Sequence, residues 1–533
     1  MRAPPDATMM RVPGAAELEV KLRLPRDAVA RLLRHPAVAS HKQGRARKRR
    51  LVSTYFDTVD LRLADAGIGL WLRRSGRKWL QSVEGPPESA HGNGLVVRPT
   101  YEWPIGSAPA MPGIDTARLA KTPWRRALLK AARHGFQPAF TTDVTRMEWP
   151  LAWPDDTSGA LAVDIGEIRA ASDSATADVC EIELAFKTGR VERLFALAGD
   201  LANDLPLSLE RASLEARGVR LASAVPQRPE RALNARIPDH ATAGEALALI
   251  AAACVRQLEG NANGLLTDDD PEWVHQMRIG TRRLRACLGM MRDLVAAGSL
   301  TPLTDELKWL AGAIGPARDL DVLATETLPA VIAGTRGTGD AATVMALRRF
   351  AATVARRRKR ARNDARAAVA SARFVRLILA AGALAAARHV DAARSAASAW
   401  LAAPAREFAR TLLARRRRKL LRYGERLAQA TAEDRHAVRI AAKKLRYATE
   451  FFADLFGKKR ARAYRAALMQ LQDTLGALND ASVAARVARE IAGPASTTAA
   501  TLQGWVAAQS VQADALAAAW RDFSRCKPFW ERG

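Results

Sequence analysis

Apolar and polar residues alternate along several short runs between residues 16 and 220. A period of two is typical of β-strands with one buried face, because successive side chains point to opposite faces of a sheet. Glycine and proline separate the runs, for example at 85–87, and stretches with helical spacing interrupt them at 26–39, 122–133 and 190–203. The pattern therefore predicts an antiparallel, β-rich domain over residues 16–220.

The spacing changes to three and four residues at about residue 241, and Ala, Leu and Arg then dominate up to residue 527. This spacing predicts amphipathic helices, so we expect an all-α domain over 241–527. Residues 221–240 are rich in proline and polar side chains, which is typical of a linker. Residues 1–15 are expected to be disordered. The predicted fold class is therefore α+β with more than one domain.

Two segments of the helical half carry the same pattern of basic residues. His275–Ala286 reads HQMRIGTRRLRA and His436–Tyr447 reads HAVRIAAKKLRY, an offset of 436 − 275 = 161. The same offset, 480 − 319 = 161, relates Ile314–Asp319 (IGPARD) to Leu475–Asp480 (LGALND). A register kept over this length indicates a duplicated structural unit.

The duplication predicts two repeats of about four helices each, at about 241–380 and about 400–527. At about 100° per residue, the basic residues of each motif share one face of a helix, and apolar residues such as Met277 and Leu284 lie opposite. In the first repeat this face carries His275, Arg278, Arg282 and Arg285. In the second repeat it carries His436, Arg439, Lys443 and Arg446, and the neighbouring positions add Arg283 and Lys444.

Each basic face has a free-energy cost, because like charges three or four residues apart destabilise a helix by about a few tenths of a kcal/mol per pair. Neither face contains an interspersed glutamate that would reduce the repulsion. An anionic ligand would relieve it. A solvated, arginine-rich surface is the alternative interpretation of one such helix, but two matched copies favour an anion-binding surface.

The net charge of +28 over 533 residues favours a polyanionic partner. The basic runs 356–360 and 415–419 contribute to it, either by lining the same surface or by facing solvent. The four cysteines are scattered without a CxxC pair, which excludes a disulfide framework and a zinc site and fits a reducing cytoplasm. No signal peptide or membrane span is apparent in the pattern. We therefore expect a cytoplasmic protein with no membrane partner.

Charged side chains alternate along strands of the predicted sheet. Glu17, Glu19 and Lys21 share one face of a strand, and Glu181 and Glu183 repeat the arrangement. If the sheet curls into a barrel, its interior also receives Asp164, Arg73, Arg98, Glu102 and Arg146. Carboxylates suit Mg²⁺ or Mn²⁺, and Lys and Arg suit phosphate oxygens, so the set predicts a metal–polyphosphate site. A strand with an ordinary solvent-facing polar side is the alternative interpretation.

The first half of the chain resembles the CYTH family of triphosphate tunnel enzymes in ELEVK (17–21), YFDT (55–58), LRLADAGIGLWLRR (61–74), RPTYEWP (98–104) and EIEL (181–184). The paired HxxRI motifs and GxxxD elements resemble the CHAD family of helical domains. The order of the two halves resembles bacterial CYTH–CHAD proteins. The resemblance implies an eight-stranded antiparallel tunnel that binds triphosphate with Mg²⁺ or Mn²⁺. It also implies two four-helix bundles whose basic surface binds inorganic polyphosphate.

The resemblance also implies roles for individual residues. The metal ligands would be Glu17, Glu19, Asp164, Glu181 and Glu183. Triphosphate would be held by Lys21, Arg73, Arg98 and Arg146, with Glu17, Glu19 and Lys21 central to catalysis. Polyphosphate would be held by His275, Arg278, Arg282, Arg283, Arg285, His436, Arg439, Lys443, Lys444 and Arg446. A histidine among so many cations is expected to be neutral and to gain charge only with a bound polyanion.

Four positions depart from the CYTH pattern. Trp71 stands where the family usually has arginine, Glu84 and Leu214 stand where it has lysine, and Thr100 stands where it has glutamate. Three of these changes remove positive charge, and electrostatic stabilisation is usually the main catalytic term in phosphoryl transfer. The sequence therefore predicts weakened or absent hydrolysis.

Three functions remain open at this stage. The first is polyphosphate binding by the helical half with a weak triphosphatase, and association with polyphosphate granules is left undecided. The second is an active, metal-dependent hydrolase of tripolyphosphate. The third is nucleic-acid binding, which is less favoured because the chain has only five tyrosines and no basic stripe interleaved with aromatic residues.

Overall fold

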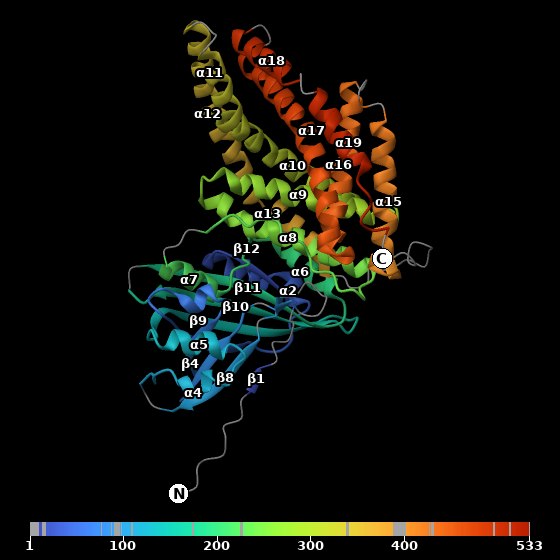
Figure 1. The fold of residues 1–533 in the computed structure, drawn as a ribbon. Coiled ribbons are helices and arrows are strands. Elements are labelled where there is room, and N and C mark those ends of the chain that lie inside the picture. Colours follow the sequence, from blue (N-terminus) through green and yellow to red (C-terminus); the bar gives the residue numbers. More distant parts are fainter. Residues whose placement is uncertain are drawn as a thin grey trace. The chain divides into compact units, whose positions relative to one another are not determined.

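The computed structural model places two compact units, which are Met1–Arg228 with Ile378–Ala386 (the sheet domain) and Pro229–Leu377 with Ala387–Gly533 (the helical domain). Figure 1 shows the elements of each. The structure describes residues 10–12, 18–75, 77–86, 88–89, 96–97, 99–107, 110–172, 175–223, 227–336, 341–386, 401–425, 427, 431–493, 496–510 and 513–531.

Ten strands of the described chain form one sheet in the order β1-β8-β5-β4-β3-β9-β10-β11-β2-β12. Their bounds in this order are Met10–Val12, Thr100–Gly106, Lys78–Glu84, Gly69–Ser75, Arg47–Asp57, Gln137–Ala152, Ser158–Ala170, Thr176–Thr188, Glu19–Arg23 and Ser208–Leu209. Two short strands pair separately, β6 (Glu88–Ser89) and β7 (Val96–Val97). All the described pairs are antiparallel, as the alternating pattern predicted.

The sheet has more strands than the eight predicted, although eight of them, from β8 to β2, have five or more residues each. The short strands β1 and β12 extend its two edges. No described pairing joins β1 to β12, so hydrogen bonds do not close the sheet into a barrel within the described residues. The fold class is thus confirmed, and the sheet differs from the expected tunnel in being open.

One face of this sheet collects the charged residues, because residues opposite one another in adjacent strands share a face. Arg146 of β9 lies opposite Asp164 of β10, which lies opposite Glu181 of β11. Glu183 of β11 lies opposite Lys21 of β2. We call these five residues and their side of the sheet the charged face.

The opposite face carries one of the two apolar clusters of the sheet domain that the structure describes. Leu70 and Leu72 of β4 pack with Val83 and Trp103 against the helices that follow. The helical elements of this domain are η1 (Arg26–Ala28), α1 (Val29–Arg34), α2 (Pro36–Ala39), α3 (Arg62–Asp65), α4 (Thr116–Leu119), α5 (Arg125–Ala132), α6 (Val191–Asp204) and α7 (Leu214–Ser223). The helices predicted at 26–39, 122–133 and 190–203 lie where the spacing placed them.

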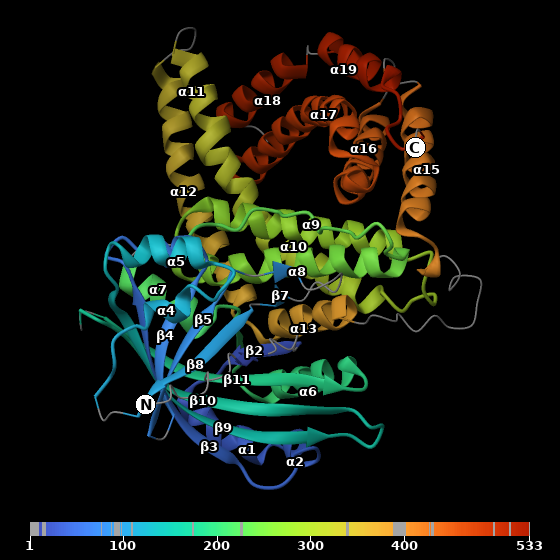
Figure 2. The ribbon, with the colours of Figure 1, turned by 60° about the horizontal axis from the view of Figure 1, so that its bottom comes forward.

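The helical domain is formed by two successive groups of helices (Figure 2). The first comprises α8 (Ala243–Thr267), α9 (Pro271–Met291), α10 (Thr301–Val322), η2 (Leu323–Thr327), α11 (Leu328–Arg336), α12 (Ala341–Val369) and the start of α13 (Ala372–Ala386), whose residues Ile378–Ala386 are counted with the sheet domain. The second comprises α15 (Ala405–Gly424), α16 (Ala432–Phe452), η4 (Ala453–Phe456), α17 (Lys458–Ala492), α18 (Thr497–Ser510) and α19 (Ala513–Arg525). No single described helix is long and apolar enough to cross a membrane, and α12 and α13 reach the threshold only jointly, as a pair bent by 57°.

The two basic motifs lie on α9 and α16, and local sequence fixes where both helices begin. The side chain of Asp270 accepts a hydrogen bond from the backbone of Glu272 at 2.8 Å, with Pro271 in the first turn. Thr431 and Asp434 exchange side-chain and backbone hydrogen bonds at the start of α16. These caps set the register that turns each basic face away from the core.

The apolar back of each helix is buried, as its spacing predicted. On α9 the side chains of Trp273, Met277 and Leu284 are fully covered, and on α16 those of Val438 and Leu445 are. Fully burying a side chain of this size contributes about 1.5–3 kcal/mol. Packing of the backs therefore holds the basic fronts in place despite the repulsion among their charges.

Candidate functional site

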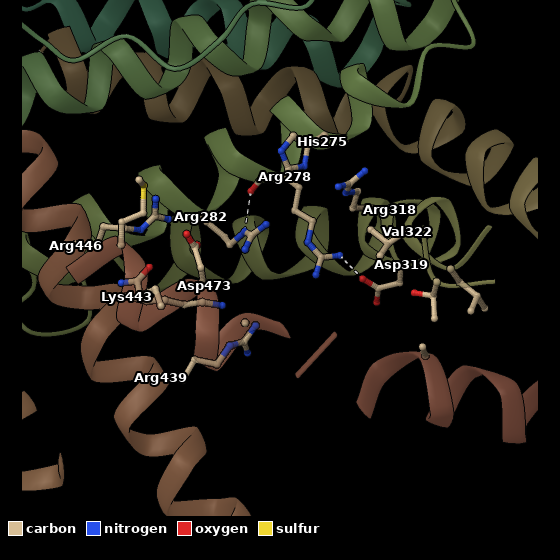
Figure 3. A pocket seen from close by; sticks show the side chains of 16 residues that line it. His275, Arg278, Arg282, Arg318, Asp319, Val322, Arg439, Lys443, Arg446 and Asp473 are labelled. Atoms are coloured by element: carbon tan, nitrogen blue, oxygen red, sulfur yellow. Dashed lines mark hydrogen bonds and ion pairs between the residues drawn. The ribbon is translucent and has the colours of Figure 1, made fainter. Parts of the chain in front are cut away.

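A cavity of about 540 Å³ lies in the helical domain among α9, α10, α16 and α17. Its basic side chains come from both repeats. Figure 3 shows those of α9 and α10 facing those of α16 across it. The lining residues that bear on the chemistry are His275, Arg278, Arg282, Arg318, Asp319, Arg439, Lys443, Arg446, Gln472 and Asp473.

The cavity is strongly cationic. Six arginine or lysine side chains face two carboxylates, Asp319 and Asp473, so its formal charge is +4 without the histidine. Such an excess in a partly enclosed space raises the local concentration of anions. The cavity is therefore a candidate site for a ligand with several negative charges.

Arg278 is fixed by the second motif of its own repeat. Its Nη1 donates to the Gly315 carbonyl oxygen at 3.0 Å and to Asp319 Oδ1 at 2.8 Å. Gly315 and Asp319 belong to the IGPARD motif of α10. The spacing between the two motifs thus brings an arginine to its carboxylate, which explains why both recur together.

Arg282 lies among other cations. Its Nε donates to the Arg278 carbonyl oxygen at 3.4 Å, and within the described chain it makes no ion pair with a carboxylate. Burial, together with the charges of Arg278, Arg446 and Arg439, lowers the pKa of its guanidinium. The group still carries its charge at neutral pH, so an anion bound here would relieve an existing repulsion.

His275 lines the same cavity, and one of its two ring nitrogens is buried there. Its Nδ1 is buried and has no hydrogen-bond partner among the described residues. Burial lowers the pKa of His275, the nearby charges of Arg318, Arg282 and Arg278 lower it further, and Glu272 alone opposes them. The ring is therefore neutral at pH 7, as the sequence suggested.

The second repeat contributes Arg439, Lys443 and Arg446 from α16. Arg446 Nη1 donates to Glu450 Oε1 at 2.9 Å, and its guanidinium lies 4.9 Å from the centre of the Tyr447 ring. This contact with its own helix holds Arg446 at the edge of the cavity. The cationic wall is therefore positioned before any ligand arrives, which reduces the entropy lost on binding.

Four of the ten residues predicted to hold polyphosphate do not line the cavity. Arg283 is buried and bonds the Leu233 carbonyl and the Asn234 side chain, with Glu450 at 3.7 Å. Arg285, His436 and Lys444 are exposed on other sides of their helices. A helical-wheel arc is wider than the part of a helix that faces one cavity, and neighbouring helices decide which part that is.

The basic runs also lie outside the cavity lining. In the run 356–360, Arg358 pairs with the buried Asp321 at 2.5 Å and the other side chains are exposed. In the run 415–419, Arg415 lies 3.4 Å from Asp293. Of the two alternatives for these runs, lining of this cavity is therefore not what the described side chains show.

The structure adds lining residues that the sequence did not single out. Arg318 precedes Asp319 in the IGPARD motif and is held by Glu326 at 3.5 Å. Gln472 and Asp473 come from α17, outside both motifs. The position of Arg318 beside the repeated aspartate was the one available signal. In the second repeat, the residues equivalent to Arg318 and Asp319 are Asn479 and Asp480, whose side chains lie outside the described residues.

A π-helical turn, η2, supplies Leu323 and Thr327 to the wall of the cavity.

The charged face of the sheet domain is different, because its cations are paired with its carboxylates. Lys21 Nζ lies 3.1 Å from Glu183 Oε2 and 3.5 Å from Glu19 Oε2. Arg146 makes two hydrogen bonds to Asp164, at 2.8 and 2.7 Å, and a third to Glu183 at 3.1 Å. The predicted metal ligands and the predicted phosphate ligands thus neutralise one another.

The pKa values of this network follow from the pairing. Burial opposes the charged forms of Lys21 and Arg146, but Glu183 with Glu19 raises the pKa of Lys21, and Asp164 with Glu183 raises the pKa of Arg146. Burial likewise opposes the charge of Glu183, yet Lys21 and Arg146 lower its pKa. All three groups are therefore charged at neutral pH.

Helix α7 packs on the same side of the sheet. Leu214 and Val219 lie against Phe140 of β9, and Gly218 approaches that ring so closely that an added Cβ would meet it at 2.0 Å. Arg217 of α7 donates to Glu181 Oε2 at 2.8 Å, and burial raises the pKa of Glu181 while Arg217 opposes the rise. Leu214, which replaces an expected lysine, is thus part of an apolar contact.

The remaining predicted residues of this face are distributed as follows. Arg73 donates to Glu102 at 2.7 Å, and Ser82 donates to the same oxygen at 2.9 Å. Trp71 is buried, with its ring 5.4 Å from that of Tyr55. Glu84 and Thr100 face each other across β5 and β8. Glu17 and Arg98 lie outside the described residues.

The described carboxylates do not form a metal site as they stand. Within the described part of the chain, no group of three His, Cys, Asp or Glu side chains is arranged to hold a metal ion. Asp164, Glu181 and Glu183 direct their oxygens to arginine or lysine instead. A divalent ion would have to displace these cations.

Two family models match the chain. The CYTH domain model matches residues 15–219, and the CHAD domain model matches residues 249–489. A structure described as the CHAD domain from the plant Ricinus communis is 31% identical, and the match covers 56% of this chain and 97% of that one with a TM-score of 0.47. The chain belongs to the CHAD family and carries a CYTH domain before its CHAD domain. The helical domain is thus the CHAD domain, and the sheet domain is the CYTH domain.

Two further solved structures are similar to parts of the chain. HpAC1 from Hippeastrum, described as having a dominant triphosphatase activity, is 22% identical over 37% of this chain and 92% of its own, with a TM-score of 0.26. PptA from Streptomyces chartreusis is 20% identical over 55% of this chain and 100% of its own, with a TM-score of 0.39. No curated protein matches the chain.

Proposed function

We propose that the CHAD domain binds inorganic polyphosphate in the cavity between its two repeats. The observation that carries the proposal is the excess of six cationic over two acidic side chains lining one space, supplied from both repeats. A flexible chain of phosphates has the charge density and the narrow width that such a cavity accommodates. Arginine can hold phosphate oxygens through two hydrogen bonds, and lysine holds them as a point charge.

The test exchanges single charges inside and outside the cavity. Arg282→Glu places a carboxylate among Arg278, Arg439 and Arg446, whereas Arg285→Glu makes the same change three residues along α9 on an exposed side chain. We expect Arg282→Glu to weaken polyphosphate binding by at least about tenfold, because charge-assisted contacts contribute about 1.5–3 kcal/mol each. Arg285→Glu should change it by less than about threefold, because exposed charges contribute little.

Equal losses in the two variants would mean that net charge alone governs retention, and the cavity would not be the site. Competition with duplex DNA at matched phosphate concentration and salt separates polyphosphate binding from general nucleic-acid binding. A preference for DNA would replace the proposal with the nucleic-acid alternative, since a net charge of +28 attracts any polyanion at low salt.

For the CYTH domain we propose triphosphate as the ligand class, with Mg²⁺ or Mn²⁺ as the ion the family implies, and hydrolysis that is weak or absent. Support comes from Lys21 and Arg146, which are already committed to carboxylates of the same face. Trp71, Glu84 and Leu214 remove three further cations from positions where the family has them. Polyphosphate retention would then be the main activity of the whole chain.

A further inference from the structure

A second group of basic side chains lies on the other flank of α16. It consists of Arg292 at the end of α9, Arg415, Arg416 and Lys419 of α15, and Lys444 of α16, and we call it the flank cluster. In the described part of the chain, Asp293 is the carboxylate that forms ion pairs with members of this cluster. None of these residues lines the cavity between the repeats.

Backbone and side-chain contacts hold the flank cluster together. Arg416 Nη1 donates to the Lys444 carbonyl oxygen at 2.5 Å, which joins α15 to α16. Asp293 is shared by Arg415 at 3.4 Å and Arg292 at 3.7 Å. Figure 2 shows α15 and α16 side by side. The five cations therefore belong to one surface built from three helices.

Most of this charge is not neutralised. In the described part of the chain, Arg416, Lys419 and Lys444 make no ion pair with a carboxylate. Burial lowers the pKa of Lys444, and the charges of Lys419, Arg416 and Arg292 lower it further. Burial and Arg415 lower the pKa of Arg416 to about 10. Groups that repel one another in this way gain stability when an anion lies between them.

The cavity and the flank cluster lie close together around one helix. Lys443 lines the cavity, and the next residue, Lys444, belongs to the flank cluster. With about 100° between successive side chains, the exposed His436 falls on the arc between these two lysines. The same arc also carries the exposed Ile440 and Glu433, so the cations of the cavity and those of the flank cluster lie on the two sides of a short stretch of mixed surface around α16.

We propose that the flank cluster is a second phosphate-binding site, which holds the part of a long polyphosphate chain that extends beyond the cavity. This inference rests on the proposed function, because it assumes that the cavity holds one part of the chain. Two connected sites raise affinity for ligands long enough to reach both, through effective concentration. Within the CHAD domain, short chains would occupy the cavity alone, so this domain would prefer long chains.

The test measures binding of tripolyphosphate and of long-chain polyphosphate to the full chain and two double variants, in EDTA, so that the CYTH domain has no divalent ion with which to hold triphosphate. Lys419→Glu with Lys444→Glu reverses two charges in the flank cluster. Lys359→Glu with Arg360→Glu reverses two exposed charges on α12 and serves as the matched control. We expect the flank variant to lose about tenfold in affinity for the long chain and less than about twofold for tripolyphosphate. The control should change neither by more than about twofold.

The outcomes separate the two proposals. If the unmodified protein binds neither phosphate chain, the proposed function itself fails. If it binds both and the flank variant keeps the same ratio of affinities, or loses no more than the control, the second site is refuted. An equal loss of duplex DNA and long-chain polyphosphate at matched phosphate would also refute it, because the cluster would then attract any polyanion. Thermal unfolding of each variant verifies that it is folded.

Discussion

At the scale of single residues, partners decide what each charge can do. Arg278, Arg282 and Arg283 lie within six residues of one helix, yet they differ in their surroundings. Arg278 pairs with Asp319, Arg282 lies among other cations and donates to a backbone carbonyl, and Arg283 is buried against Asn234 and Glu450. Only Arg282 of these three combines access to the cavity with unneutralised charge.

His275 gives a pH-dependent prediction. The pKa of His275 is lowered in the folded protein without ligand. As the pH falls through about 6.5, this histidine therefore binds a proton in the unfolded chain before it does so in the folded chain. The free energy of unfolding decreases over that pH range as a result. Arg318, Arg282, Arg278 and Glu272 are the charged groups that face it. A bound phosphate chain should raise its pKa, so that polyphosphate binding takes up a proton and strengthens below neutral pH.

An NMR titration of the His275 ring with and without polyphosphate measures this shift directly. His275→Gln should remove the dependence of affinity on pH while retaining binding at pH 8. The exposed His134, which belongs to the sheet domain, offers the matched control His134→Gln, which should leave the pH dependence in place. An unchanged His275 titration in the presence of ligand would disprove the coupling.

Arg217 gives a prediction about stability. Its side chain and that of Glu181 are almost entirely buried, at 8% and 4% exposure, and they bond at 2.8 Å. Arg217→Met leaves a buried carboxylate unpaired, which costs about 3–5 kcal/mol. Urea denaturation should show a lower midpoint for the transition of the CYTH domain.

Two variants make this prediction specific. Arg26→Met breaks an exposed pair with Asp178, at 51% and 80% exposure, and should cost less than about 1 kcal/mol. Adding Glu181→Leu to Arg217→Met removes the unpaired charge and should recover part of the loss. If the double variant is no more stable than Arg217→Met, the loss comes from packing of the arginine rather than from the carboxylate.

At the scale of elements, close approach between helices is set by glycine. Gly424 at the end of α15 lies so near Trp520 of α19 that an added Cβ would meet the ring at 1.9 Å. The small residue lets the two helices of the second repeat pack together. It also fixes the position of α15, which carries three residues of the flank cluster.

Gly424→Ala should therefore destabilise the CHAD domain by about 1–3 kcal/mol, because the ring cannot move without disturbing its neighbours. Gly504→Ala on α18 is the matched control, since an added Cβ meets nothing within 4 Å there. That change should stabilise its helix by about 0.5–1 kcal/mol. Thermal unfolding of the two variants would show opposite shifts, and a shift of the same sign in both would contradict the packing argument.

At the scale of the whole molecule, two domains use similar side chains in opposite ways. In the CHAD cavity six cations face two carboxylates. On the charged face of the CYTH domain, Lys21 and Arg146 are matched by Asp164, Glu183 and Glu19. The excess of positive charge in the CHAD cavity attracts a polyanion directly. On the charged face, the ion pairs of Lys21 and Arg146 have to break before these two cations can bind phosphate. We therefore expect binding to be strong and hydrolysis slow in the same chain.

Phosphate release from tripolyphosphate with Mg²⁺ or Mn²⁺ tests this expectation. We expect a rate only slightly above that without protein, and Glu17→Gln or Glu183→Gln should lower it to the background. Neither change should alter polyphosphate binding, because both residues lie outside the CHAD domain. Rapid release that depends on Glu17 would show an active triphosphatase and overturn the weakened-enzyme proposal.

The sequence by itself determined the antiparallel sheet, the helical half and the duplication. Each follows from a local signal, since a period of two, a spacing of three and four, and a repeated motif do not depend on distant contacts. The caps at Asp270 and Thr431 likewise arise within a few residues of the helix starts. The resemblance to both families rested on the same short motifs.

Tertiary structure alone decided which charges act together. The motif grouped Arg285, His436 and Lys444 with the cavity residues, but packing of α9 and α16 against their neighbours leaves these three side chains exposed outside the cavity. Packing also added Arg318 and Asp473 and paired Lys21 with Glu183. A side chain's direction along a helix is local, but what it faces depends on elements that arrive from far along the chain. For that reason periodicity predicted the basic helices, and only the fold showed which of their residues share a cavity.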